Sequence, residues 1–279
     1  MEVPYKLEVI ALTTIIIKLG VSVFPYSGKN QPPKFGDYEA QRHWMEITDI
    51  HLIRYRNTTD NDLLNWGLDY PPLTAYQSYL TGSVAMKINQ DYVKLHVSQG
   101  FENFDHQYFM RMSVLVSDCI FFVSALYFNI RSLKMSNKYK WVFFALSSHS
   151  GLTLIDYGHF QYNCVSLGLT LWAINFVSQG KNVLAAIAFS AALNFKQMEL
   201  YHAILLFAGF YLLASCQPKG SSLPSQLKNL VQIGAATVAT FTIIWYLFLQ
   251  IHDWLLQQVI VRLFIPFQRG IFEDYVSNF

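Results

Sequence analysis

Apolar stretches long enough to cross a bilayer alternate along this chain with short polar connectors. A helix needs about 20 largely apolar residues to cross the hydrocarbon core, and fewer where its ends are buried in protein. On this pattern we predict membrane helices at roughly residues 7–26, 110–130, 141–156, 162–178, 183–195, 200–216 and 229–251. Lys18 interrupts the first stretch and no small-residue cleavage pattern follows it, which favours a retained helix over a signal peptide. The sequence therefore predicts an all-α integral membrane protein that crosses the bilayer about seven times.

Composition supports the same class of protein. Hydrophobic residues make up 53% of the 279 positions, charged residues only 14%, and the mean hydropathy is +0.25. A formal net charge of +2 without any basic run excludes nucleic acid as a partner. Three cysteines lie in or beside apolar segments without metal-ligand spacing, so we interpret them as buried thiols; they are Cys119, Cys164 and Cys216.

Basic residues in the short connectors predict the orientation, because lysine and arginine collect on the cytoplasmic side of membrane helices. They fall in alternate connectors: Arg131, Lys134, Lys138 and Lys140 in one, Lys181 in a second, and Lys219 and Lys228 in a third. The opposite face then receives the long segment 27–109, the turn around residues 156–163, the region after residue 195 and the C-terminal tail. Each cluster of unusual polar residues outside the helices is expected on that face.

The segment 27–109 is too long and too aromatic for a simple connector. Its tryptophans and tyrosines prefer the headgroup level of a bilayer; they include Trp44, Trp66, Tyr70, Tyr76 and Tyr79. We predict short helices at 37–48 and 72–87 that lie along the membrane surface, the second started by Pro71 and Pro72. Asn57 begins the acceptor sequon Asn-Thr-Thr and is a candidate for glycosylation.

The stretch F-G-D-Y-E-A-Q-R-H-W-M-E-I-T, residues 35–48, gathers charged side chains in an otherwise apolar chain. Asp37 follows Gly36 where a helix would begin, so one interpretation is a helix N-cap. The acids and bases that follow stand three or four positions apart and are consistent with surface ion pairs. The alternative is catalytic: Asp37 acts as a general base, and Glu39, Arg42 and His43 hold or orient a substrate.

Further polar residues interrupt the chain at several places. Asp69, just before Tyr70 and Pro71, is a helix cap or a substrate ligand. D-Y-G-H-F-Q-Y-N, residues 156–163, is expected to form a tight turn in which His159 and Gln161 bind a sugar or stabilise the turn. Asp156 and His159 have a possible metal spacing, but two ligands without a third are weak evidence for a metal.

Charges inside or beside the apolar stretches form another group. Asp118 lies in the middle of a predicted membrane helix, where a charge faces a cavity or a partner, and we interpret it as a buried side chain held by a hydrogen bond. Lys196, with Gln197 and Glu199, breaks another apolar stretch. In the tail, Arg262 and Arg269 suit a lipid phosphate, because the planar guanidinium binds phosphate through two parallel hydrogen bonds.

Five ordered motifs together resemble one family. They are G-D-Y-E-A-Q-R-H-W-M-E-I-T, W-G-L-D-Y-P-P-L-T-A-Y, G-H-F-Q-Y-N, F-K-Q-M and R-L-F-I-P-F-Q-R-G-I-F-E-D. The family is that of the endoplasmic-reticulum glucosyltransferases that use dolichyl-phosphate glucose to build the lipid-linked oligosaccharide for N-glycosylation. Within it, the motifs are most similar to the branch that adds the first glucose, in alpha-1,3 linkage, to Man9GlcNAc2 on dolichyl pyrophosphate.

This resemblance implies a polytopic GT-C-like fold in the endoplasmic-reticulum membrane, with a lumenal active site. It implies an inverting hexosyltransferase with no cofactor and no metal, whose partners are dolichyl-phosphate glucose, the lipid-linked oligosaccharide and the bilayer. By position in the motif, Asp37 is the catalytic base. Candidates for donor or acceptor contacts are Glu39, Arg42, His43, Asp69, His159, Gln161, Lys196, Arg262 and Arg269.

Family members are longer, so residues 1–279 are expected to be a single N-terminal portion of the fold: a fragment, a truncated isoform or an incomplete gene model. Two alternatives stay open on the residues alone. One is a catalytically inactive isoform or membrane subunit. The other is a transporter of lipids or solutes, which buried charges and broken apolar segments also suit.

Overall fold

The computed structural model of the chain describes residues 7–33, 35–50, 66–68, 70–132, 138–203 and 223–249. These residues form helices and connecting turns, and none of them belongs to a strand, so the predicted all-α class is confirmed for this part of the chain. Asn57, Asp69, Cys216, Arg262, Arg269 and most of the predicted helix 200–216 lie outside the described residues.

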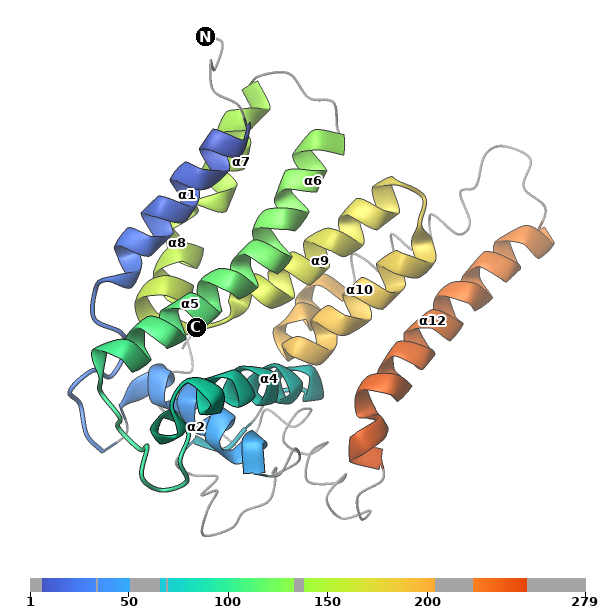
Figure 1. The fold of residues 1–279 in the computed structure, drawn as a ribbon. Helices are drawn as coiled ribbons and strands as arrows, with labels where there is room; N and C mark the ends of the chain where they lie inside the picture. Colours follow the sequence, from blue (N-terminus) through green and yellow to red (C-terminus); the bar gives the residue numbers. More distant parts are fainter. Residues whose placement is uncertain are drawn as a thin grey trace, which may run out of the picture.

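A bundle of roughly aligned helices makes up most of the molecule (Figure 1). Its elements are α1 (Leu7–Ser22), α5 (Phe104–Asp118), η2 (Cys119–Val123), α6 (Ser124–Ser132), α7 (Lys138–Ser147), α8 (Ser150–Thr153), η3 (Leu154–Phe160), α9 (Asn163–Ser178) and α10 (Asn182–Phe195). α1 packs on α7, α6 and η2 pack on α9, and α9 packs along α10. The short 3-10 turn η4 (Gln197–Glu199) follows α10. The last described helix, α12 (Leu223–Leu249), packs along the outer side of α10.

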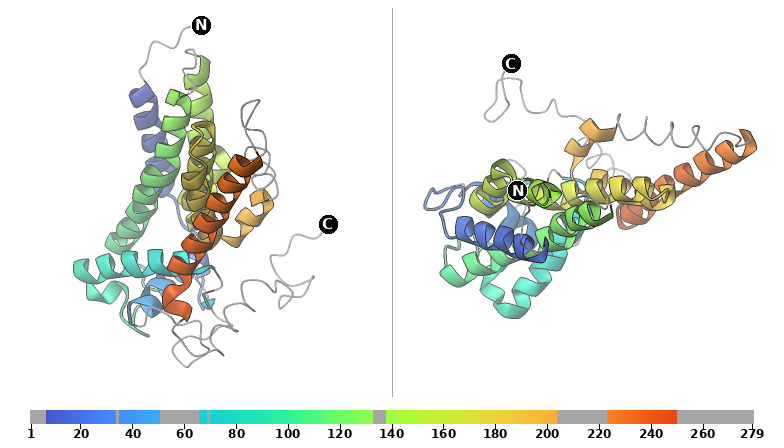
Figure 2. Two further views of the ribbon diagram at one scale, coloured as in Figure 1. Left: turned by 90° about the vertical axis from the view of Figure 1, so that its right-hand side faces the viewer. Right: turned by 90° about the horizontal axis from the view of Figure 1, so that it is seen from above.

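Two helices cross one end of this bundle. α2 (Gly36–Ile50) and α4 (Pro72–Ile88) pack on each other and run across the ends of the bundle helices, as both Figure 1 and the left view of Figure 2 show. Their bounds confirm the helices predicted at 37–48 and 72–87. Pro71 precedes α4 in an extended conformation and Pro72 is its first residue, where the missing N–H leaves no helical hydrogen bond unmade. A 3-10 turn, η1 (Gln90–Tyr92), follows α4.

The predicted membrane segments differ from the helices in two ways. The segment 110–130 belongs to a longer continuous helical run, Phe104–Ser132, while the segment 141–156 is divided, because α7 ends at Ser147 and a π-helical turn begins at Leu154. Among the described residues, two helices are long and apolar enough to cross a membrane, Phe104–Ser132 and Leu223–Phe248. The count of seven crossings stays a prediction.

The main apolar core lies where the α2 and α4 layer meets the bundle. Its buried side chains come from both layers and include Tyr38, Met45, Met110, Tyr157 and Phe160. Charged side chains are also buried within the bundle, and they pair: Lys18 of α1 lies 2.5 Å from Asp118 of α5, and both are almost fully enclosed. Asp118 is therefore buried as predicted, with an ion-pair partner from the first helix.

The two ends of the bundle differ in chemistry. The end of α6 that carries Arg131 and the connection between α9 and α10 that carries Lys181 lie away from α2 and α4 (Figure 1). Gln161 and Lys196 lie at the other end, against the crossing helices. This arrangement agrees with the predicted separation of basic connectors from polar clusters.

Candidate functional site

Asp37 meets the 156–163 segment across the junction of the two layers. Its Oδ2 lies 2.9 Å from Nε2 of His159, and Nε2 of Gln161 donates to the same oxygen at 2.5 Å. Because a carboxylate only accepts hydrogen bonds, the His159 ring carries its proton on Nε2 in this contact. The Asp37 side chain is 32% exposed and that of His159 51% exposed, so both face an open surface.

The local backbone explains how Asp37 reaches this place. Gly36 has φ +64, and a Cβ at this position would stand 2.5 Å from the carbonyl oxygen of Ser27, so a side chain would push α2 away. Ser27 N–H donates to the carbonyl of His159 at 3.2 Å, which fixes the opposite wall. In the first turn of α2, Asp37 bonds to these side chains rather than to a backbone N–H, so the helix-cap interpretation does not describe it.

The other charges of α2 form a buried network. Nη2 of Arg42 lies 2.5 Å from Glu39 and 2.7 Å from Glu46, and its Nε donates to Glu39 at 2.8 Å. The three side chains are at most 3% exposed, so the interpretation as surface pairs is wrong. Backbone N–H groups of His96 and Gly100 donate to the two carboxylates, and Arg42 also bonds Ser98. This network fastens α2 to the loop before α5.

The opposite charges in this network shift the pKa values of Arg42 and Glu46 in the directions that favour their charged forms. Burial alone would lower the pKa of Arg42, but its hydrogen bond with Glu39 and the charges of both glutamates raise it above the ordinary value. Burial would raise the pKa of Glu46, but bonds from His43 and Arg42 and the charge of Arg42 hold it below the usual range. His43 is the outermost member, 18% exposed and 3.3 Å from Glu46.

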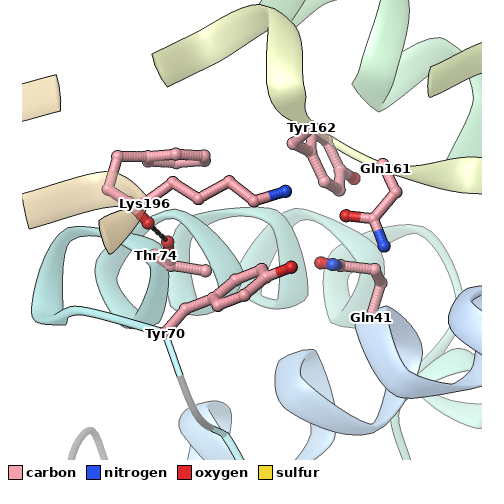
Figure 3. Close-up of a pocket in the computed structure, with 7 residues that line it drawn as sticks. Gln41, Tyr70, Thr74, Gln161, Tyr162 and Lys196 are labelled. Carbon is pink, nitrogen blue, oxygen red and sulfur yellow. Dashed lines mark hydrogen bonds between the residues drawn. The ribbon is translucent and has the colours of Figure 1, made fainter. Parts of the chain in front are cut away.

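Gln161, which donates to Asp37, also lines a pocket, which Figure 3 shows. Its lining residues come from α2, from α4 and the residues before it, from the link between η3 and α9, and from the end of α10 and the residue after it; they are Gln41, Tyr70, Thr74, Gln161, Tyr162, Phe195 and Lys196. Nζ of Lys196 donates to Asn163 at 2.5 Å and lies 5.1 Å from the centre of the Tyr70 ring. Figure 3 shows the amides of Gln41 and Gln161 facing each other near the Tyr70 hydroxyl.

Gln41 is a site residue that the sequence patterns did not single out. It is 2% exposed, and its Oε1 has no hydrogen-bond partner among the described residues. A buried acceptor without a partner is costly, which suits a group that a ligand satisfies. Gln41 stands four positions after Asp37 on α2, and residues at that spacing share a helix face, so the signal was present in the spacing.

Asp156 and His159 do not share a metal site. Asp156 accepts from the backbone N–H groups of Asn163 and Cys164, at 3.1 and 2.7 Å, and so caps α9, whereas His159 turns to Asp37. The segment is also not a tight turn: η3 is a π-helix whose last residue, Phe160, has φ +89 and leads into extended Gln161. In the described ranges no group of three or more His, Cys, Asp or Glu side chains is arranged so that it could hold a metal ion.

Comparison with known proteins identifies similar chains. The sequence profile of the ALG6, ALG8 glycosyltransferase family matches residues 11–279. The chain is 45% identical over 276 residues to the dolichyl pyrophosphate Man9GlcNAc2 alpha-1,3-glucosyltransferase of Gallus gallus, covering 98% of this chain and 54% of the relative, and the same figures hold for Mus musculus. The probable enzyme of that name from Arabidopsis thaliana is 45% identical over 278 residues, covering 97% of this chain and 51% of the relative. The chain thus spans about half the length of the curated relatives it matches.

Proposed function

Because the chain belongs to the ALG6, ALG8 glycosyltransferase family, we propose that it transfers glucose from dolichyl-phosphate glucose to the Man9GlcNAc2 oligosaccharide on dolichyl pyrophosphate. The new bond is an alpha-1,3 linkage made with inversion. The chain acts in the endoplasmic-reticulum membrane as a multi-pass, GT-C-like helical protein whose active site faces the lumen. The names of the relatives support the acceptor and the linkage, and the chemistry of the Asp37 site supports the reaction type.

The position of Asp37 carries this proposal. Among the acids of α2 near the site, Asp37 is partly exposed and oriented by two donors, whereas Glu39 and Glu46 are buried around Arg42. Both orienting contacts use Oδ2, which leaves Oδ1 to accept the hydrogen of a substrate hydroxyl. A general base must lie within hydrogen-bond reach of the proton that it removes, and a partly exposed carboxylate meets this condition.

The reaction then follows in one displacement. The carboxylate of Asp37 takes the proton of the mannose 3-hydroxyl while that oxygen forms a bond to the anomeric carbon of β-linked glucose. The bond from that carbon to the phosphate oxygen breaks, and dolichyl phosphate leaves with the electron pair. The proton ends on Asp37. An ionised phosphate needs no protonation to leave, so one carboxylate and cationic stabilisation are sufficient.

The pocket beside Gln161 supplies groups for binding the reacting sugar and phosphate. Lys196 offers a positive charge, and Gln41 offers an amide with an unsatisfied oxygen, which suits a sugar hydroxyl. We assign to His159 and Gln161 the role of orienting Asp37. Glu39 and Arg42 stabilise the position of α2, and His43 lies at the edge where the acceptor would bind. Asp69, Arg262 and Arg269 remain candidates for contacts with the donor or acceptor.

The transporter alternative rested on buried charges. Lys18 and Asp118 neutralise each other inside the bundle, so that pair needs no transport pathway to account for it.

Replacement of Asp37 by asparagine tests the proposal. The Asp37→Asn variant keeps the size and the acceptor oxygen but loses the basicity. We expect transfer to fall by roughly a hundredfold or more, as loss of a general base costs, while thermal stability in detergent stays unchanged. Transfer is measured with dolichyl-phosphate glucose and a Man9 lipid-linked acceptor. The assay uses both the chain itself and a chimera in which it replaces the aligned part of the Gallus gallus relative.

The assay includes two controls. Asp105→Asn changes an exposed acid in the first turn of α5, and we expect near-normal transfer. Addition of EDTA is expected to leave the rate unchanged, because the proposed displacement needs no Lewis acid. If the unaltered chimera formed no product, the proposed function would be overturned. Full activity of Asp37→Asn would instead remove Asp37 from the role of base.

A further inference from the structure

The segment that holds His159 and Gln161 is anchored at successive residues. Asp156 caps α9, and the Tyr157 hydroxyl donates to Asp118 at 2.6 Å. The carbonyl of Gly158 accepts from Arg111 at 3.0 Å, and the carbonyl of His159 accepts from Ser27 N–H at 3.2 Å. The placement of this segment therefore depends on bonds to other helices more than on its own helical pattern.

The contact at Tyr157 reaches into the middle of the bundle. Oδ2 of Asp118 receives both the Tyr157 hydroxyl and, at 2.5 Å, the ammonium of Lys18. Lys18 and Asp118 are 0% exposed and Tyr157 is 1% exposed. Lys18 also lies 5.5 Å from the centre of the Tyr157 ring. One carboxylate thus ties together α1, the end of α5 and η3.

This cluster is not arranged for maximal stability. Oδ1 of Asp118 is buried without a hydrogen-bond partner among the described residues, and a well-packed apolar replacement of a buried ion pair is often no less stable. Both neighbouring elements are π-helical: η2 starts one residue after Asp118, and η3 contains Tyr157. Such turns are rare in proteins and occur frequently at functional sites.

We propose that the buried carboxylate of Asp118, charge-balanced by Lys18 and acting through the Tyr157 hydroxyl, positions His159 and Gln161 against Asp37. His159 follows Tyr157 by two residues and Gln161 by four, so a shift of η3 moves both donors. The catalytic part of this inference rests on the proposed role of Asp37 as base. Tyr157 and Asp118 are positioning residues, because they act on His159 and Gln161 only through the intervening backbone, and Lys18 balances the charge of Asp118.

Two double variants separate positioning from stability. Lys18→Met with Asp118→Asn removes both charges but keeps an oxygen that accepts from Tyr157. Lys18→Met with Asp118→Leu removes the charges and the acceptor together. We expect kcat to be retained in the first variant and to fall by roughly tenfold to a hundredfold in the second, with KM for the acceptor little changed, as expected for misplaced catalytic groups. Thermal stability in detergent is expected to be similar for both.

Tyr157→Phe makes the same test with the ion pair intact. It keeps the ring and removes only the hydroxyl, and we expect the fall in kcat seen for the variant with Asp118→Leu. Normal kcat in Tyr157→Phe, or equal kcat in the two double variants, would overturn the proposed positioning role.

Chemical labelling supplies a readout that does not depend on transfer. Diethyl pyrocarbonate modifies exposed imidazoles, and mass spectrometry reports the rate at each histidine. Loss of the bond to Asp37 is expected to speed modification of His159 in Tyr157→Phe and in the variant with Asp118→Leu. His202 is the matched control, because it is similarly exposed, 48%, and bonds Glu199 at 2.8 Å. An unchanged His159 rate contradicts the inference even if kcat falls, and a failed assay with the unaltered chimera contradicts only the proposed function.

Discussion

The acidic side chains of α2 differ in burial, and this difference separates the candidate catalytic acid from the acids that hold the helix in place. Asp37 and Glu39 stand two positions apart in one helical turn, yet Asp37 faces the open site and Glu39 is enclosed around Arg42. The sequence spacing predicted pairs between Glu39, Arg42 and Glu46, and those pairs exist. Their depth was not predictable from α2 alone, because the loop residues that cover them, such as Ser98 and Gly100, come more than 50 positions later.

Removal of the central cation tests the bracing role. Arg42→Met leaves Glu39 and Glu46 buried without their shared partner, and breaking a buried pair in this way costs about 3–5 kcal/mol. We expect a correspondingly lower thermal midpoint in detergent at neutral pH. Arg131→Met, which removes an exposed arginine near Tyr127, is the control and is expected to change stability little.

Lowering the pH should reduce the stability difference between the native chain and Arg42→Met, because acid affects the two proteins in opposite directions. In the native chain the folded pKa of Glu46 lies below the ordinary glutamate pKa. The ionised Glu46 side chain therefore contributes its full stabilisation at pH values above the ordinary pKa, and this contribution is lost as the pH falls through the lower folded pKa. In Arg42→Met the contribution of Arg42 is lost while the burial stays, so the pKa of Glu46 is expected to rise, and protonation restores stability. The gap between the two proteins should therefore narrow as the pH falls through the raised carboxyl pKa of the variant, and narrow further through the depressed pKa of Glu46 in the native chain. A constant gap would show that Glu46 does not depend on Arg42.

At the scale of elements, close backbone approach determines how the bundle packs. Gly168 of α9 lies against η2, where a Cβ would stand 2.5 Å from the carbonyl carbon of Phe121. A backbone neighbour cannot rotate away as a side chain can. The apolar character of α9 was visible in the sequence, but the need for glycine at this contact depends on the π-helical path of η2, which hydropathy does not report.

Gly168→Ala tests this packing. The added methyl group must push α9 from η2, and we expect a loss of about 1–3 kcal/mol, as overpacking of a filled core costs. Gly234→Ala in α12 is the matched control, because no atom lies within 4 Å of its Cβ and alanine favours a helix. Thermal unfolding in detergent distinguishes the two. Equal midpoints for both variants would mean that the α9–η2 contact yields without cost.

The elements that the sequence predicted well are those with local signals. α2 and α4 begin at glycine and proline positions whose conformational limits are properties of the residues themselves. The predicted segment 141–156 is divided because residues 147–150, Ser-Ser-His-Ser, are polar and α7 ends there, whereas the prediction counted them as part of one helix. For the site, the motifs indicated Asp37, His159 and Gln161, but their mutual contact and the pocket residue Gln41 depend on packing between distant segments.

At the scale of the whole molecule, the chain has two chemically different ends. The crossing helices, the Asp37 site and the pocket lie at one end, and the connectors with Arg131 and Lys181 at the other (Figure 1). α12 exposes large apolar side chains such as Val231, Val238 and Ile243 along its length, as a lipid-facing helix does. This distribution is the one expected under the proposed orientation, in which the basic connectors face the cytoplasm and the candidate site faces the lumen.

Glycosylation of Asn57 tests this orientation. The sequon lies in the segment 27–109, which is expected in the lumen, so expression in a eukaryotic membrane should add a glycan. Glycosidase treatment is expected to increase the electrophoretic mobility of the native chain but not that of Asn57→Gln. Protease protection provides the opposing measurement: cleavage of residues 27–109 from the cytosolic side of sealed microsomes would reverse the orientation.

The pairing of Lys18 with Asp118 also has a consequence for the order of events during synthesis of the chain. The two residues are 100 positions apart, and at roughly 5–20 residues per second the ribosome adds Asp118 about 5–20 s after Lys18. During that interval the first helix carries a cation without its counter-ion. On the predicted topology, in which α1 crosses the membrane, an isolated lysine is unfavourable in lipid, and this favours retention of the nascent helix at a hydrated, protein-lined insertion machinery until Asp118 is made. The delay is longer between Asp37 and Gln161, which are 124 positions apart. The hydrogen bonds of the candidate site are therefore among the later contacts to form.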